Sequence, residues 1–249
     1  MRRCALLLAA GALALTGCGG GPDELKVSAA ASLKTALTGY GASFERARAR
    51  FSFGGSDELA AQIRKGARPD VFAAANTKLP DELYDEGLVE RPVTFAGNRL
   101  VLAVPAGGDG TVGSLRDAGR AGATIAIGSE GVPVGAYTRA LLAKLSESES
   151  SAILRNVRTE EPDVAGIVGK LTRGAVDAGF VYASDVRATA GRLKAIELPD
   201  SLQPGVAYAA AVVKGTAREE AARAFLDGLL EGDGAEALEA AGFEPPPRQ

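Results

Sequence analysis

Histidine is absent from this 249-residue sequence, and cysteine occurs only twice, as Cys4 and Cys18. Without histidine the chain lacks the usual general base, the Ser-His-Asp triad and the commonest zinc ligand. Because both cysteines lie within the first 18 residues, the body of the chain has no disulfide and no thiol for catalysis or metal binding. These absences count against the commonest hydrolases and zinc enzymes.

The sequence also has no excess of basic residues. It contains 28 Lys and Arg against 31 Asp and Glu, which gives a net charge of −3. If residues 1–18 are removed, Arg2 and Arg3 leave with them. The remaining 26 basic and 31 acidic residues then give −5. We find no basic footprint for nucleic acid, so no nucleic-acid partner is expected.

An extended apolar run at the N-terminus, Ala5–Thr16, follows Arg2 and Arg3. It is too short for a permanent membrane span but is typical of an export signal. The string Leu15-Thr16-Gly17-Cys18 resembles a bacterial lipobox, in which the cysteine becomes the lipid-bearing first residue of the mature protein. We predict a lipoprotein signal peptide over 1–18, a Gly-rich tether over 19–24 and lipidation of Cys18. The alternative is an ordinary secretory signal that is cleaved nearby.

Short apolar segments alternate with amphipathic helical patterns in the rest of the chain. This alternation is typical of the α/β class, and the length suits two lobes of ordinary size. The predicted strands are Leu25–Ala30, Phe51–Phe53, Val71–Ala74, Leu100–Val104, Thr124–Ile127, Ala178–Val181, Leu193–Glu197 and Val206–Val213. Helices are expected between them, one of them at Asn76–Glu86.

Two strand-to-helix junctions in the N-terminal part each place a serine at a helix start. The apolar residues of Leu33–Phe44 follow one helical stripe, which puts Ser32 at or beside the N-cap, and Ser56 follows Gly54 and Gly55 in the same way. A helix start offers unpaired N–H groups and a positive dipole end, so each serine suits an anion. Taken alone, each serine is better explained as the cap of its own helix, because most N-cap serines bind nothing else.

Two longer apolar segments are predicted to cross between the lobes. Gly97–Pro105 is long enough to leave one lobe and enter another, and Val206–Val213 mirrors it. Two crossings make the first lobe discontinuous, closed by C-terminal helices. We therefore predict lobe I over 25–97 and 207–249, lobe II over 98–206, and a hinge between them.

The second lobe repeats the strand-to-helix construction. A Gly/Pro loop, Ser129–Gly135, follows one strand, Asp163 is the natural cap of a later helix, and another buried strand ends at Tyr182. Open α/β sheets bind ligands beyond the carboxyl ends of their strands. Four helix starts and the Tyr182 hydroxyl should therefore face one rim from two lobes.

Six motifs carry a family resemblance through their order and spacing. They are Ala29–Leu33, Phe53–Ser56, Pro69–Phe72, Gly97–Leu102, Val132–Tyr137 and Gly179–Tyr182. Together they resemble the periplasmic molybdate-binding proteins of ATP-driven molybdate importers. The resemblance implies a two-lobed periplasmic binding protein fold (type II), with a hinge between the lobes and a ligand cleft at the strand C-terminal ends.

The resemblance also implies a ligand site for molybdate or tungstate. Two serine hydroxyls, backbone amides and a tyrosine hydroxyl would hold the oxyanion, without direct ligation of molybdenum and without a cofactor. Carried over by motif, these positions are Ser32, Ser56, Val134, Val164 and Tyr182. Val134 stands where the family often has alanine, a change that keeps the backbone donor. The implied partners are an ABC permease and its ATPase, and the implied protein is a monomer, lipid-anchored outside the cytoplasm.

The chemistry of molybdate fits such a site independently of the resemblance. At neutral pH the dianion has no proton to donate, so a pocket made only of donors suits it. The carboxylates of Asp57, Asp70 and Asp163 are expected to cap helices or turns and to point away. With no histidine to titrate, affinity is expected to depend weakly on pH.

Three alternatives remain open from the sequence. The site could take another tetrahedral oxyanion such as sulfate. The size of the cavity would then decide between sulfate and molybdate. A hydrolase could use Ser32 or Ser56 as nucleophile with Lys34 as base, although Lys34 lies two residues from Ser32 on a helix and so points to another face. A purely structural lipoprotein would have an incidental cleft.

Overall fold

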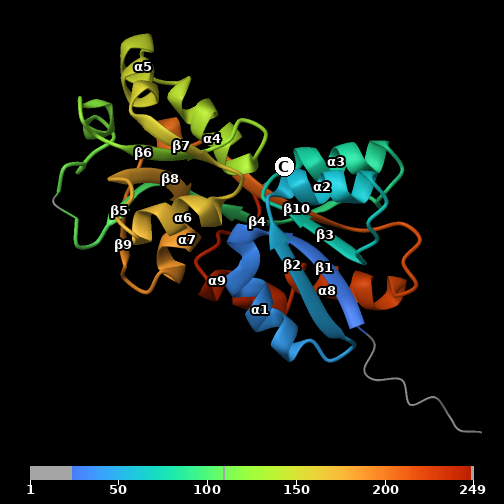
Figure 1. The fold of residues 1–249 in the computed structure, drawn as a ribbon. Helices are drawn as coiled ribbons and strands as arrows, with labels where there is room; N and C mark the ends of the chain where they lie inside the picture. The colour runs from blue at the N-terminus through green and yellow to red at the C-terminus, as the bar shows by residue number, and fades with distance from the viewer. Residues whose placement is uncertain (1–23, 109, 248–249) are drawn as a thin grey trace, which may run out of the picture.

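The computed structural model describes residues 24–108 and 110–247. The predicted signal peptide, with Cys18, and all but the last residue of the predicted tether lie outside these described residues. The described chain forms two lobes, each built on a five-stranded sheet with flanking helices (Figure 1). Within the described ranges, no helix combines the length and the apolar character needed to cross a membrane.

The first sheet has the strand order β2-β1-β3-β10-β4. Its strands are β1 (Glu24–Ala30), β2 (Arg48–Gly54), β3 (Val71–Ala74), β4 (Val93–Asn98) and β10 (Val206–Val212). Strand β1 pairs in parallel with β2 and β3, whereas β10 runs antiparallel to β3 and β4. The central strands β1, β3 and β10 are almost wholly buried, because helices cover both faces of the sheet.

The helices of the first lobe come from both ends of the chain. They are the 3-10 turn η1 (Ala31–Leu33), α1 (Lys34–Ser43), α2 (Ser56–Arg64), α3 (Lys78–Asp85), α8 (Glu219–Leu230) and α9 (Asp233–Ala240). The predicted stripe of α1 is confirmed, since Leu33, Leu37 and Tyr40 are buried. Tyr40 donates to the Phe225 carbonyl at 3.2 Å and packs on the Phe225 ring, which fixes α1 against the C-terminal helix α8.

The second sheet repeats the pattern of the first, with the order β7-β6-β8-β5-β9. Its strands are β5 (Leu100–Pro105), β6 (Ile125–Gly128), β7 (Val157–Glu161), β8 (Ala178–Tyr182) and β9 (Leu193–Ile196). Here β6 is parallel to β7 and β8, and β5 is antiparallel to β8 and β9. The second lobe also contains α4 (Pro133–Leu142), α5 (Glu147–Arg155), α6 (Val164–Thr172), α7 (Ala183–Ala188) and the 3-10 turns η2 (Asp117–Gly119) and η3 (Asp200–Leu202).

The crossings between the lobes differ from the sequence-based prediction in detail. Gly97–Pro105 is not one strand but the end of β4 and all of β5, which belong to different sheets and are separated by Arg99. Strand β10 does not cross, because all of it pairs within the first sheet, and the return crossing is the segment 197–205. The two crossings are joined by an Arg99–Asp200 ion pair at 2.6 Å and by Gln203, which hydrogen-bonds both backbone groups of Leu100.

Two strands, β7 and most of β4, were missed by the prediction from the sequence. Strand β7 has the sequence VRTEE and no fully buried residue, because it lies at the edge of its sheet. Its apolar pattern is therefore too weak to indicate a strand. Only the last two residues of β4 fell within the segment predicted as a strand.

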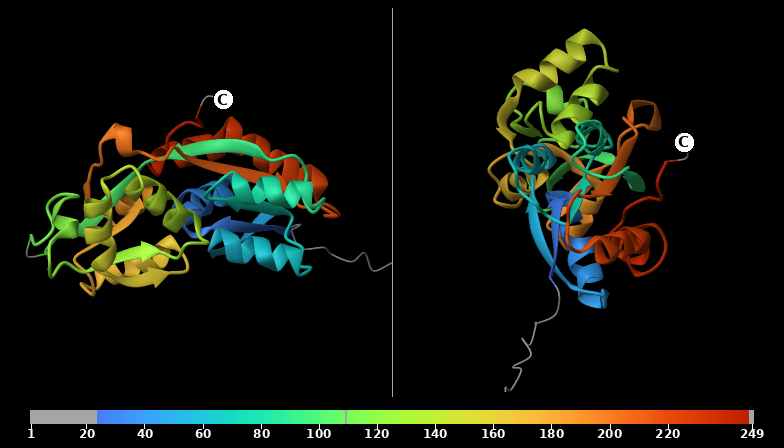
Figure 2. Two further views of the ribbon diagram at one scale, coloured as in Figure 1. Left: turned by 90° about the horizontal axis from the view of Figure 1, so that it is seen from above. Right: turned by 90° about the vertical axis from the view of Figure 1, so that its right-hand side faces the viewer.

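The fold brings together the carboxyl ends of six strands, three parallel strands from each lobe. These are the ends of β1, β2 and β3 in the first lobe and of β6, β7 and β8 in the second. Figure 2 shows the two lobes side by side, joined along one side by the segments that contain the crossings. The residues that follow the six strands therefore face each other between the lobes.

Candidate functional site

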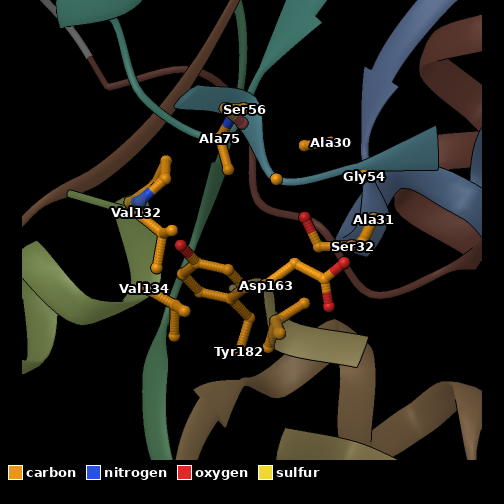
Figure 3. A pocket seen from close by; sticks show the side chains of 13 residues that line it. Ala30, Ala31, Ser32, Gly54, Ser56, Ala75, Val132, Val134, Asp163 and Tyr182 are labelled. Atoms are coloured by element: carbon orange, nitrogen blue, oxygen red, sulfur yellow. The ribbon is translucent and has the colours of Figure 1, made fainter. Parts of the chain in front are cut away.

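A small pocket lies between the lobes where the six strand ends meet (Figure 3). Its lining consists only of residues at or just beyond those ends: Ala30, Ala31, Ser32, Gly54, Gly55, Ser56, Ala75, Val132, Pro133, Val134, Asp163, Val164 and Tyr182. All five residues that the sequence analysis selected as ligand-binding are in this set. The structure thus brings together residues that are up to 150 positions apart in the chain.

Ser32 enters the pocket from the 3-10 turn η1. The turn follows β1 directly, and α1 begins two residues later with Leu33 as its N-cap, so Ser32 lies beside the cap as expected. The Ser32 hydroxyl caps no backbone group. It is instead 3.0 Å from the Tyr208 hydroxyl of β10, and both side chains are buried.

Ser56 is the first residue of α2, with Gly55 as N-cap. Its Oγ accepts a hydrogen bond from the Ala75 N–H at 3.1 Å, a contact that ties the helix start to the end of β3. A hydroxyl that accepts from one side can still donate its own proton to a ligand on the other. Ser56 is 2% exposed, so its polar atom is held in a dry environment.

Val134 and Val164 bring the starts of two helices of the second lobe into the lining. Val134 is the second residue of α4, after Pro133, and Val164 is the first residue of α6. The N–H groups of a first helical turn have no partner within the helix, so these positions can donate to an anion. A Cβ on Gly128 would meet Val134 Cγ1 at 2.6 Å, so the glycine there makes room for the Val134 side chain.

Tyr182 is the last residue of β8, and it is 1% exposed. Its hydroxyl oxygen is buried and has no hydrogen-bond partner among the described residues. Burial, with smaller contributions from Tyr208, Tyr137 and Asp185, raises the pKa of the Tyr182 hydroxyl well above its usual value. The side chain therefore keeps its proton at neutral pH and can donate it.

The three carboxylates singled out in the sequence behave differently from one another. Asp163 caps α6 by accepting from the Gly166 N–H at 2.9 Å, as predicted, but it also lines the pocket, against the expectation that it points away. Asp70 accepts from Lys26 N at 2.6 Å and from the Thr216 hydroxyl, outside the lining. Asp57 lies in the first turn of α2 outside the lining, and its Oδ1 is buried without a partner among the described residues.

Sequence reasoning missed two polar residues behind the pocket. One is Tyr208, the partner of Ser32. A single hydroxyl-bearing aromatic in a strand of alanines and valines was a signal that could have found it. The other is Asp185, a buried carboxylate on α7 that accepts from the Tyr182 N–H at 3.0 Å. Nothing in the sequence near Asp185 indicates burial, because the position is set by how α7 packs on β8.

The side-chain hydrogen-bond donors of the lining, two serine hydroxyls and one tyrosine hydroxyl, are neutral groups. No lysine or arginine lines the pocket, and its one carboxylate already accepts from the α6 backbone. Lys34, the base of the hydrolase alternative, is exposed and lies outside the lining. The cavity volume is about 20 Å³, so the pocket suits a compact ion of a few atoms.

A family model for bacterial extracellular solute-binding proteins matches residues 25–244. The chain belongs to this family. Within it, the chain is similar to the molybdate-binding protein ModA of Mycobacterium tuberculosis (strain ATCC 25618 / H37Rv), with 33% identity over 231 residues that cover 91% of this chain and 86% of that protein. The resemblance to molybdate-binding proteins that the motifs predicted is confirmed.

Two further relatives extend the comparison. The putative ABC transporter substrate-binding lipoprotein YvgL of Bacillus subtilis (strain 168) is 29% identical, over 88% of this chain and 85% of that protein. The solved structure of the Azotobacter vinelandii periplasmic molybdate-binding protein superimposes with a TM-score of 0.80, at 24% identity, covering 90% of this chain and all of that one. The predicted two-lobed periplasmic binding protein fold is thereby confirmed.

Proposed function

We propose that this protein binds molybdate, or tungstate, in the pocket between its lobes and delivers it to an ABC permease. Ser32, Ser56 and Tyr182 would donate hydroxyl protons to the oxyanion, and the backbone N–H groups of Val134 and Val164 would complete the donor set. The protein itself would act as a carrier and not as an enzyme. No observation in the pocket favours the hydrolase alternative.

The observation that carries this proposal is the Tyr182 hydroxyl. A buried polar atom without a partner costs on the order of 1–3 kcal/mol, yet this one lies at the pocket, where a bound acceptor would satisfy it. An oxyanion with four oxygens can accept from Tyr182 on one lobe and from Ser32 and Ser56 on the other at once. The names of the relatives support molybdate as that anion.

The proposal includes two lobes that close on the ligand about a hinge. We shift the predicted boundaries by one residue and assign lobe I to 25–98 and 206–249 and lobe II to 99–205, because Asn98 of β4 and Val206 of β10 pair in the first sheet, whereas β5 and β9 pair in the second. The Arg99–Asp200 pair and the Leu100–Gln203 contacts join the two crossings, so they would bend together. We further propose a monomer that is anchored through Cys18, a role that the description of YvgL as a lipoprotein supports.

Calorimetric titration of the purified protein with molybdate, tungstate and sulfate tests the proposal. We expect molybdate and tungstate to bind and sulfate to bind more weakly, because the pocket would fit the larger dianions. Ser32→Ala, Ser56→Ala and Tyr182→Phe should each weaken molybdate binding by about one to two decades, the worth of a hydrogen bond to a charged group, roughly 1.5–3 kcal/mol.

Ser43→Ala is the matched control, because the Ser43 hydroxyl donates to the Tyr40 carbonyl on the exposed end of α1, away from the pocket. It should leave the affinity unchanged. Molybdate should also raise the melting temperature of the wild type more than that of the three pocket variants. Equal molybdate affinity in the wild type and all three variants would overturn the assignment of the site.

A further inference from the structure

Behind the pocket, Ser32 is in contact with a tyrosine that does not itself line the cavity. The hydroxyls of Ser32 and Tyr208 are 3.0 Å apart, and either can be the donor. Tyr208 is fully buried on β10, whereas Ser32 is on η1, 176 residues earlier in the chain. The contact therefore exists only in the folded first lobe.

The ring of Tyr208 is held in place by three aromatic neighbours. It makes edge-to-face contacts with Phe95 of β4, with Tyr182 at the end of β8, and with Phe243 near the C-terminus, at centroid distances of 6.3, 5.8 and 5.2 Å. Such packing leaves the hydroxyl little freedom to move. Tyr208 thus presents its oxygen to Ser32 from a fixed position.

The direction of the Ser32–Tyr208 hydrogen bond follows from the charge of the ligand. A dianion can only accept, so a Ser32 hydroxyl that binds it must use its one proton for the ligand. Ser32 Oγ can then only accept from Tyr208, which donates its own proton. Burial raises the pKa of Tyr208 well above its usual value, so this proton is retained at neutral pH.

We propose that Tyr208 is a positioning residue for the oxyanion: by donating to Ser32 Oγ it directs the Ser32 proton into the pocket. The inference rests on the proposed function, since it requires an anion that accepts from Ser32. It adds a residue that lies outside the pocket lining and acts on the ligand only through Ser32.

A double-mutant cycle in binding tests this role. Tyr208→Phe keeps the ring and removes one oxygen, and it should weaken molybdate binding by about threefold to tenfold, the net value of one hydrogen bond. In a Ser32→Ala background there is no serine proton to direct. The same Tyr208→Phe change should then alter the affinity by less than about twofold, a non-additivity expected of residues in direct contact.

Tyr40→Phe is the matched control, because Tyr40 is also a buried tyrosine of the first lobe but donates to the Phe225 carbonyl, outside the pocket lining. It should leave the affinity unchanged in both backgrounds. An unchanged affinity in Tyr208→Phe, or the same fold loss in both backgrounds, would overturn the positioning role and leave the proposed function standing. The cycle is measured with whichever of molybdate, tungstate and sulfate the wild type binds; binding of none of them would overturn both.

Discussion

At the scale of single residues, Asp185 is the group whose behaviour is least ordinary. Burial raises the pKa of its carboxyl from 3.8 to about 7, and nearby Asp163 adds to the rise, while the hydrogen bond from Tyr182 N acts in the opposite direction. The expectation that affinity depends weakly on pH rested on the absence of histidine. It stays a prediction, but the structure supplies a carboxyl that titrates in the neutral range beside Tyr182.

Asp185 should make the protein less stable as the pH rises from about 4 to about 7. In this window the folded state holds the Asp185 proton and the unfolded chain has lost it, so the free energy of unfolding falls, by at most about 1.4 kcal/mol per pH unit. Above pH 7 both states are ionised and the effect is complete. In Asp185→Asn this component disappears. The stability of the variant minus that of the wild type should therefore be greater at pH 8 than at pH 4.

Urea denaturation of both proteins at pH 4, 6 and 8 measures this difference, and the other carboxyl groups cancel in the comparison. Asp117→Asn serves as a control. Hydrogen bonding from Ser114 holds the pKa of the Asp117 carboxyl below its usual range, so its contribution to stability changes mainly below about pH 4, and the profile of this variant from pH 4 to 8 should run nearly parallel to that of the wild type. Parallel stability profiles for the wild type and Asp185→Asn would contradict the prediction.

At the scale of elements, Gly55 brings the start of α2 close to the backbone of the second lobe. A Cβ built on Gly55 would be 2.6 Å from the carbonyl oxygen of Pro162, which precedes the start of α6. The Gly55 backbone itself, at φ −62° and ψ 133°, is open to any residue. The same Cβ would be 2.9 Å from Asp57 Oδ1, but that atom is the end of a side chain that can move, so the glycine is required chiefly by the Pro162 backbone of the other lobe and not by the conformation of its own turn.

Gly55→Ala should weaken molybdate binding by roughly tenfold, because overpacking at a rigid backbone contact costs on the order of 1–3 kcal/mol. The melting temperature without ligand should change little, since an open form relieves the clash. Calorimetry and thermal melts measure the two effects. Gly39→Ala is the control, because a Cβ there meets nothing within 4 Å and the residue is exposed on α1. A Gly55→Ala protein with wild-type affinity would show that the lobes can bind without this contact.

At the scale of the whole molecule, the described chain contains no helix able to span a membrane, and the proposed anchor lies before it, at Cys18. Cys18→Ser should release the protein from the membrane or stall its processing, because no lipid can then be attached. Fractionation of cells that express either form, followed by mass spectrometry of the N-terminus, measures the outcome. Correctly cleaved Cys18→Ser protein that stays in the membrane fraction would rule out the lipid anchor.

The sequence by itself determined the α/β class and the site residues that follow strands. Val71–Ala74 was predicted with its exact bounds, and Ser32, Ser56, Val134, Val164 and Tyr182 were all selected before the structure placed them around one pocket. Apolar periodicity, glycines and helix starts are local features and located the strand ends, which meet at one edge of each sheet, whereas the resemblance to molybdate-binding proteins supplied the set of five site residues.

Only the tertiary structure decided the features that depend on residues distant in sequence. The edge strand β7, the break at Arg99 and the return crossing at 197–205 follow from which strands pair, and that pairing leaves no local pattern. The partner of Ser32 is 176 residues away, and the pKa of Asp185 is set by the helix and strand that bury it. Burial and long-range contacts arise from packing between segments that are distant in the sequence. Local sequence patterns therefore cannot predict them.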